Sequence, residues 1–178
     1  MKKLISFAAL FIAMGMVFSV NAYAQKGTGG IIGDKNRVSP IVDVLRSQNR
    51  FSILIEAIEK AQIGNILDSQ PGGVSLFAPT NAAFAKLPAS TVQNILADKE
   101  QLIALLSYHV TPVRMRTAED YVALGTVSTL LQGTTLQFTG NMSNNFYVNS
   151  TEFSASWTIP FKNGMIWVID EVLSPEIM

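Results

Sequence analysis

The sequence lacks cysteine altogether and has a single histidine, His109, among 178 residues. Without cysteine there are no disulfide bonds, thiol nucleophiles or thiolate metal sites, and one histidine is too few for the usual zinc ligand sets. Charged residues are also scarce at 15%, and the 13 basic residues equal the 13 acidic ones. Because nucleic-acid-binding proteins gather Lys and Arg on one surface, this balance argues against a nucleic-acid partner. The apolar fraction of 48% is enough for one packed core.

The N-terminus has the pattern of a secretory signal peptide. Lys2 and Lys3 precede an apolar run from Leu4 to Val20, and the small residues of Ala22-Tyr23-Ala24 follow. We therefore predict a signal peptide over residues 1–24 and a protein that is periplasmic, cell-surface or secreted. The apolar run has 17 residues, near the minimum that spans a bilayer. An uncleaved membrane anchor is the alternative, and the membrane would be a partner only through it.

The remaining chain divides into a leader and one domain. Residues 25–37 hold four glycines and little that is apolar, so we expect a flexible leader there. From residue 38 to residue 178 the sequence shows no internal repeat and no low-complexity segment. This stretch is of ordinary single-domain length, and we predict one domain over 38–178.

Helical signals dominate the first part of this domain. Apolar residues recur at intervals of three and four over residues 51–61, which predicts a helix with one buried face. Ser39 followed by Pro40 predicts the start of an earlier helix, with Ser39 as its cap. Thr117 and Asp120 have the spacing of a capping box and predict a later short helix.

Strand signals dominate the second part. Gly64 and the segment 71–73 are expected to end the helical pattern before a short buried strand over residues 74–78. Apolar and mostly polar residues alternate over 153–159, as in a half-buried strand. Asn163-Gly164 predicts a hairpin turn, because both residue types tolerate positive φ. Helices followed by antiparallel strands predict the α+β class.

Three segments carry a resemblance to a known family. They are residues 75–84, with the sequence SLFAPTNAAF, the pair Tyr108-His109, and residues 163–170, with the sequence NGMIWVID. In order and spacing these segments resemble the fasciclin (FAS1) domain, over about Val38 to Pro175. The resemblance implies a β-sandwich-like wedge of antiparallel strands with helices packed along it. It also implies extracellular adhesion or protein interaction without catalysis.

The two longer segments are expected to shape the fold. Phe77 can enter the core, Pro79 can end a strand, Thr80 can cap the next helix and Asn81 can pair exposed backbone groups at the corner. Residues with this structural role are predicted to be Ser75, Phe77, Pro79, Thr80, Asn81, Phe84, Asn163, Gly164, Ile166, Trp167, Ile169 and Asp170.

The sequence departs from the family pattern at two positions. Trp167 stands where the second conserved segment usually has His, which keeps the bulk but changes the polar capability. Thr158 stands where animal members have the Asp of an Asp-Ile motif linked to integrin binding. Since a metal-dependent integrin site requires that carboxylate, the resemblance does not extend to integrin binding by this route.

Tyr108 and His109 are the candidate binding residues, because the resemblance implies a role in adhesion for this pair. The competing interpretation is that His109, beside Leu105 and Val110, lies in the interior with its imidazole bonded to a backbone carbonyl.

The sequence contains no recognisable catalytic set. No G-x-S-x-G turn presents a serine to His109, and Asp170 and Glu171 are neighbours that a strand would point to opposite faces. We therefore expect no enzyme activity, no cofactor and no metal. The leading interpretation is a binding module for an extracellular or envelope protein or polysaccharide.

Two alternatives to this function stay open. One is a carrier whose cavity takes a lipophilic ligand, with Phe146, Tyr147, Phe153 and Trp157 as candidate lining residues. The other is a structural envelope or self-association module, for which an exposed apolar patch would be the indication.

Overall fold

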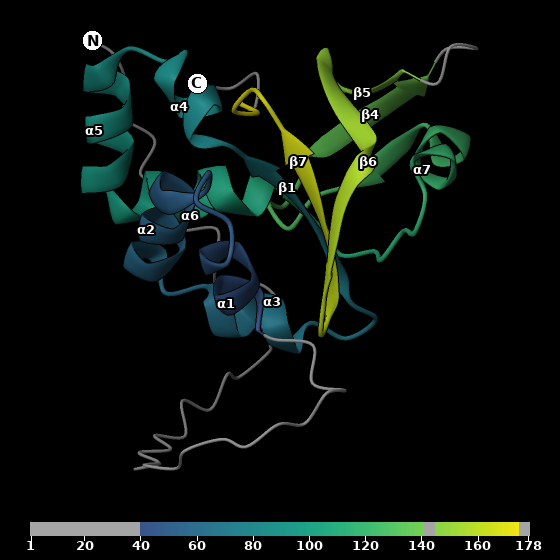
Figure 1. Cartoon of the computed structure of the whole chain (residues 1–178), viewed down its shortest axis with the longest axis horizontal. Helices are drawn as coiled ribbons and strands as arrows, with labels where there is room; N and C mark the ends of the chain where they lie inside the picture. The colour runs from purple at the N-terminus through teal and green to yellow at the C-terminus, as the bar shows by residue number, and fades with distance from the viewer. Residues whose placement is uncertain (1–39, 141–144, 175–178) are drawn as a thin grey trace, which may run out of the picture. The chain divides into compact units, whose positions relative to one another are not determined.

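The computed structural model describes residues 40–140 and 145–174, with the backbone alone at 154–156. These residues belong to one compact unit (Figure 1). The helices are α1 (Ile41–Arg46), α2 (Ser52–Ala61), α3 (Gly64–Ser69), α4 (Asn81–Ala85), α5 (Ala89–Ala97), α6 (Lys99–Tyr108) and α7 (Ala118–Leu124). The strands are β1 (Val74–Pro79), β2 (Val110–Thr111), β3 (Thr126–Ser128), β4 (Thr135–Gly140), β5 (Phe146–Val148), β6 (Thr151–Phe161) and β7 (Gly164–Ile169). The α+β class predicted from the sequence is confirmed.

The strands form one mixed sheet with the order β2-β1-β7-β6-β5-β4-β3. Among the described strands, β1 and β7 pair in parallel, from Val74 opposite Gly164 to Pro79 opposite Ile169, and the other neighbours pair antiparallel. The sequence signals predicted antiparallel strands and did not reveal this parallel pair. A parallel pair needs a long connection, and here the connection contains every element from α4 to β6.

The parallel pair separates two hydrophobic cores. Every residue of β1 is buried, as expected for a strand covered on both faces. Leu76 and Ile166 belong to a core shared with α1, α2, α3 and α6. Phe77 and Trp167 belong to an aromatic core on the other face, whose rings are those of Phe77, Tyr108, Tyr121, Phe138, Phe146, Phe153 and Trp167. Figure 1 shows α7, which carries Tyr121, on the β4–β6 side of the sheet, away from α1–α3.

Local capping signals fixed several helix starts. The hydroxyl of Thr117 accepts a hydrogen bond from the backbone N–H of Asp120, and the Asp120 carboxylate accepts from that of Thr117, so the predicted capping box of α7 is confirmed. The first described helix begins at Ile41 with Pro40 as its N-cap, one residue later than predicted, and Ser39 lies outside the described residues. The segment that begins at Gly64 forms the short helix α3, which we did not predict. Leu67 is the buried residue of this helix and packs in the core.

The hairpin between β6 and β7 occurs where expected but not for the expected reason. Its turn residues are Lys162 and Asn163, and β7 begins at Gly164. Neither Asn163 nor Gly164 has a positive φ. Glycine is required at 164 because an added Cβ would lie 1.9 Å from the carbonyl oxygen of Val74 and 2.9 Å from the ring of Phe161. The close approach of two backbones therefore selects this glycine.

A bulge in β6 changes which side chains face the core. Phe153 pairs with Ile169 and Thr158 pairs with Trp167, so β6 contributes extra residues between these two pairs. The alternation predicted for 153–159 is therefore wrong at Trp157, whose side chain is 53% exposed while Phe153 is buried.

The predicted signal peptide (1–24), the predicted leader (25–37) and the first two residues of the predicted domain (38–39) lie outside the described residues. Over residues 40–140 and 145–174, no helix combines the length and the apolar character that crossing a bilayer requires.

Candidate functional site

Thr80 joins the two signature segments. Its hydroxyl accepts a hydrogen bond from the backbone N–H of Ala83 at 3.2 Å and donates to the Asp170 carboxylate at 3.1 Å. The first contact caps α4, as predicted, and the second fastens that cap to the end of β7. Thr80 is buried and Asp170 is exposed.

Replacing Thr80 by Ala is expected to lower the free energy of unfolding by about 1 kcal/mol, because the cap of α4 is lost. Thr80→Ser keeps the hydroxyl and is the matched control. Urea denaturation of the two variants measures the difference. Equal stability of the Ala and Ser variants would show that the hydroxyl does not stabilise the corner.

Asn81 fixes the corner to the segment that precedes α2. Its side-chain oxygen accepts from the backbone N–H of Ile53 at 3.1 Å, and its amide nitrogen donates to the Ser52 hydroxyl at 2.9 Å. Its own backbone N–H donates to the Arg50 carbonyl at 2.8 Å. Asn81 therefore pairs open backbone groups at a helix start, as expected, but the helix is α2 rather than its own.

Asn163 also pairs backbone groups at the end of a helix, in this case α3. Its amide nitrogen donates to the carbonyl oxygens of Leu67 and Gln70, both at 3.0 Å, at the C-terminal end of α3. Ser75 donates its hydroxyl to the Val113 carbonyl at 2.9 Å. These amide and hydroxyl groups satisfy backbone atoms and are not available to a ligand.

The apolar signature residues lie in the cores. Phe77, Phe84, Ile166, Trp167 and Ile169 are all buried. The indole nitrogen of Trp167 has no hydrogen-bond partner among the described residues, so the Trp at this position contributes packing and no internal polar contact.

His109 is enclosed by the fold. Its side chain is 1% exposed. The Nδ1–H donates to the Leu105 carbonyl at 2.8 Å, and Nε2 accepts from the backbone N–H of Leu173 at 2.9 Å. Burial lowers the pKa of His109 to about 4, against a smaller opposing effect of the Leu105 carbonyl. The imidazole is therefore neutral near pH 7, and it links α6 to the segment that follows β7.

Tyr108 is also buried, at 5% exposure, but it lines a hollow. The hydroxyl accepts a hydrogen bond from the side-chain nitrogen of Asn149 at 3.0 Å, and both residues line an open hollow. Of the predicted binding pair, only Tyr108 is placed where a bound molecule could contact it.

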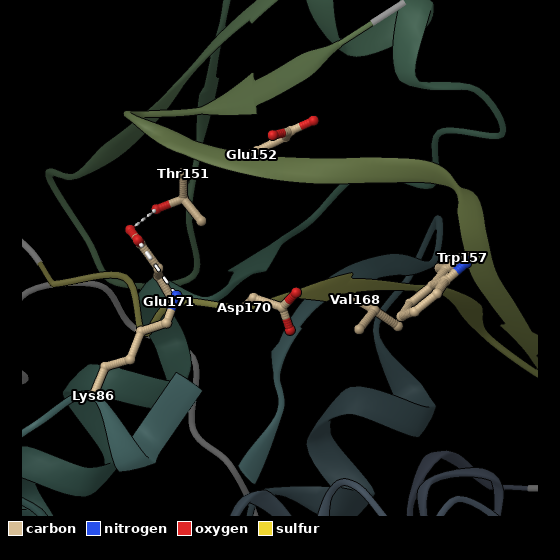
Figure 2. Close-up of a pocket in the computed structure, with 7 residues that line it drawn as sticks. All are labelled: Lys86, Thr151, Glu152, Trp157, Val168, Asp170 and Glu171. Atoms are coloured by element: carbon tan, nitrogen blue, oxygen red, sulfur yellow. Dashed lines mark hydrogen bonds and ion pairs between the residues drawn. The ribbon is translucent and has the colours of Figure 1, made fainter. Parts of the chain in front are cut away.

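A first hollow lies between the start of β6 and the end of β7 (Figure 2). It encloses about 500 Å³ and is lined by Lys86, Thr151, Glu152, Trp157, Val168, Asp170 and Glu171. In Figure 2, Thr151 and Glu171 lie at one end and Trp157 at the other, with Asp170 and Val168 between them. Sequence reasoning did not assemble this set, because residues 152 and 157 reach it through the pairing of β6 with β7 and residue 86 reaches it from the end of α4.

Polar contacts hold the end of the first hollow at which Thr151 and Glu171 lie. The Thr151 hydroxyl donates to the Glu171 carboxylate at 3.1 Å, and the Lys86 ammonium lies 3.7 Å from the same carboxylate. Both Asp170 and Glu171 line the hollow, whereas we predicted that these neighbours would point to opposite faces. The prediction is wrong because β7 ends at Ile169, so the two residues do not follow strand geometry.

A second hollow of about 550 Å³ adjoins the first. It shares Thr151 and Glu171 with the first hollow, and most of its other lining side chains carry hydroxyl or amide groups. Among the residues that the structure describes, no cluster of His, Asp and Glu is suited to hold a metal ion.

Comparison with known proteins agrees with this architecture. Residues 49–175 match the family model of the Fasciclin domain. The solved structure of a FAS1 domain pair from the insect cell adhesion molecule Fasciclin I matches 73% of this chain and 45% of that chain, with a TM-score of 0.56 and 20% identity. This likeness confirms the predicted FAS1 fold.

Two relatives illustrate the range of proteins that contain this domain. Protein sll1483 of Synechocystis sp. is 36% identical over 137 residues, which cover 76% of this chain and 73% of the relative. The rabbit (Oryctolagus cuniculus) transforming growth factor-beta-induced protein ig-h3 is 30% identical over 166 residues, which cover 88% of this chain but only 23% of that larger protein. With a family model that spans most of its length, the chain belongs to the fasciclin domain family.

Proposed function

We propose that this protein is an exported, non-catalytic binding module that attaches to a protein or polysaccharide of the cell surface or envelope. One observation carries the proposal. Apart from Asp170, the signature side chains are used in internal packing and hydrogen bonds, whereas polar side chains line two open hollows on the surface and the exposed indole of Trp157 lines the first of them. Membership of the fasciclin family supports the same kind of role.

The state of the ionisable groups supports binding without catalysis. Both ring nitrogens of His109 are occupied by backbone groups, so this residue is not available as a general base for an external substrate. The Asp170 carboxylate accepts from Thr80, and the Glu171 carboxylate is held by Thr151 and Lys86. These contacts give each carboxylate a structural role.

The two alternative functions have less support. A lipophilic carrier needs an apolar cavity, but Phe146 and Phe153 are packed in the aromatic core and the first hollow is lined mainly by polar side chains. Self-association through an apolar patch would need neighbouring exposed apolar residues. Within residues 40–140 and 145–174, the large exposed ones are Ile66, Leu124 and Trp157, which come from three different elements.

Binding to defined surface materials tests the proposal. The purified protein is immobilised and exposed separately to extracellular-matrix proteins, envelope extract and polysaccharides. We expect saturable binding to at least one of them, with no chemical change in the bound material. Absence of saturable binding by folded protein, or conversion of the bound material to products, would contradict the proposed function.

Tyr108 provides a specific variant for this assay. Tyr108→Phe keeps the buried ring and removes the hydroxyl that bonds Asn149 at the second hollow. If the hydroxyl contributes to the binding surface, affinity falls while the melting temperature changes by only a few degrees. An equal loss of stability and binding would assign Tyr108 to packing.

A further inference from the structure

The first hollow combines an exposed indole with hydrogen-bonding groups of both charges. We propose that it binds a neutral polysaccharide, with Trp157 as the platform on which a sugar ring stacks. This inference rests on the proposed binding function and assigns to it a site and a ligand class.

Trp157 is held in place and still presents surface to solvent. Its side chain is 53% exposed, although burying an indole is strongly favourable. The guanidinium carbon of Arg50 lies 4.9 Å from the centroid of the Trp157 ring and 5.3 Å from that of Phe51. Stacking on Arg50 orients the indole before any ligand arrives. The C–H face of a pyranose is an apolar surface, and it can stack on the part of the indole ring that lines the hollow.

The other side chains of the hollow match the hydroxyl groups of a sugar. The carboxylates of Glu152 and Asp170 are acceptors, and the ammonium of Lys86 is a donor. The volume of about 500 Å³ is within the range of small-molecule sites. A hollow with this lining can hydrogen-bond hydroxyl groups around the rim of a stacked ring.

The arrangement of charge favours a neutral ligand. Arg50 is already stacked on Trp157, and it would repel a second cation at that ring. The three carboxylates of the hollow would repel an anionic sugar such as a uronate. An acidic glycan therefore fits less well than an uncharged one, and the ring of Trp157, already stacked on Arg50, is not a platform for a basic group.

The sheet topology argues against a peptide that binds by strand addition. The hollow lies over β7, an inner strand paired with β1 and β6, and over the start of β6, where Thr151 to Phe153 pair with β5. A peptide can extend a sheet only at a free edge. A ligand over β7 and the start of β6 must therefore be held by side chains.

The adjoining second hollow indicates a chain rather than a single sugar. The two hollows meet at Thr151 and Glu171. Beyond these residues the lining includes Thr135, Gln137 and Asn149, which offer further hydroxyl and amide groups. An oligosaccharide that stacks on Trp157 can therefore extend into the second hollow, and we expect affinity to rise with its length.

Oligosaccharide binding to the full chain tests the inference. Disaccharides and hexasaccharides of the cello, malto, xylo and manno series are titrated by calorimetry, with alginate oligosaccharides as the anionic comparison. Trp157→Ala is expected to weaken binding by at least about tenfold, as truncation of an aromatic anchor does. Leu124→Ala is the matched control, because Leu124 is also 53% exposed but belongs to α7. Melting temperatures establish that both variants are folded.

Tryptophan fluorescence gives a second, independent measurement. The sequence has two tryptophans, and Trp167 is fully buried, so an aqueous quencher reports mainly on Trp157. A bound hexasaccharide should protect this fluorescence, and Asp170→Asn should weaken the protection without removing the cap contact to Thr80.

The outcomes separate this inference from the proposed function. Binding of a neutral hexasaccharide that is weakened in Trp157→Ala and unchanged in Leu124→Ala supports both. Binding to surface proteins with no binding to any neutral glycan overturns the inference and leaves the proposed function standing. Glycan binding that is equal in Trp157→Ala, or tighter for alginate, overturns the site or the ligand class. Release of reducing ends from the glycan would overturn the non-catalytic function itself.

Discussion

Gly164→Ala is expected to destabilise the protein by about 3 kcal/mol or more, or to prevent folding. The new Cβ would lie 1.9 Å from the Val74 carbonyl oxygen, and this oxygen belongs to backbone that cannot move without disturbing β1. Because Gly164 does not have a positive φ, alanine is conformationally acceptable there. The decrease in the free energy of unfolding therefore reports the close approach of β1 and β7 and not backbone strain. Urea denaturation, with soluble yield as a second readout, measures it.

Gly133→Ala is the matched control for this prediction. Gly133 has a φ of +78° and an added Cβ would meet nothing within 4 Å, so only the cost of left-handed backbone applies, about 1 kcal/mol. If the two glycine variants were equally stable, the proposed contact between Gly164 and Val74 would be refuted.

The stability of the protein is expected to fall by about 3 kcal/mol through His109 alone as the pH drops from about 6.5 to about 4. Burial lowers the pKa of His109 from 6.5 to about 4 in the folded state. Between these values the unfolded chain binds a proton that the folded chain does not, so acid favours unfolding. The contribution is fully present above pH 6.5 and is lost progressively below it.

His109→Gln separates this effect from that of the carboxylates. The variant cannot titrate in this range, so its stability should be lower at pH 7 but should fall less steeply toward pH 4. Since His109 is the only histidine in the sequence, a single imidazole signal in the NMR spectrum follows its protonation. An imidazole that titrates near pH 6.5 in the folded protein, or parallel pH profiles of the two proteins, would contradict the assignment.

Features determined by neighbouring residues could be predicted from the sequence. Thr80 accepts from the backbone N–H three residues later, and Thr117 exchanges hydrogen bonds with Asp120. The burial of β1 also follows from local pattern. In each case the partners lie within one or two turns of the chain.

Features determined by distant residues could not be predicted in the same way. Gly164 is required by the carbonyl of Val74, and His109 is held by the N–H of Leu173. Trp157 is exposed because of a bulge whose position depends on pairing with β7. The first hollow is likewise assembled from Lys86 after α4, from β6 and from the end of β7, so no single segment of sequence contains its pattern.

The pairing of β1 with β7 has a consequence for how this protein acquires its structure. Val74 must find Gly164 and Pro79 must find Ile169, which are contacts of high sequence separation at the centre of the sheet. Such contacts slow folding, because most of the chain's freedom is given up before they form. A nascent chain that ends before residue 164 lacks the strand between β1 and β6, and it leaves the apolar residues of both strands uncovered. We therefore expect the growing polypeptide to stay non-native, and dependent on chaperones, until synthesis has passed Ile169.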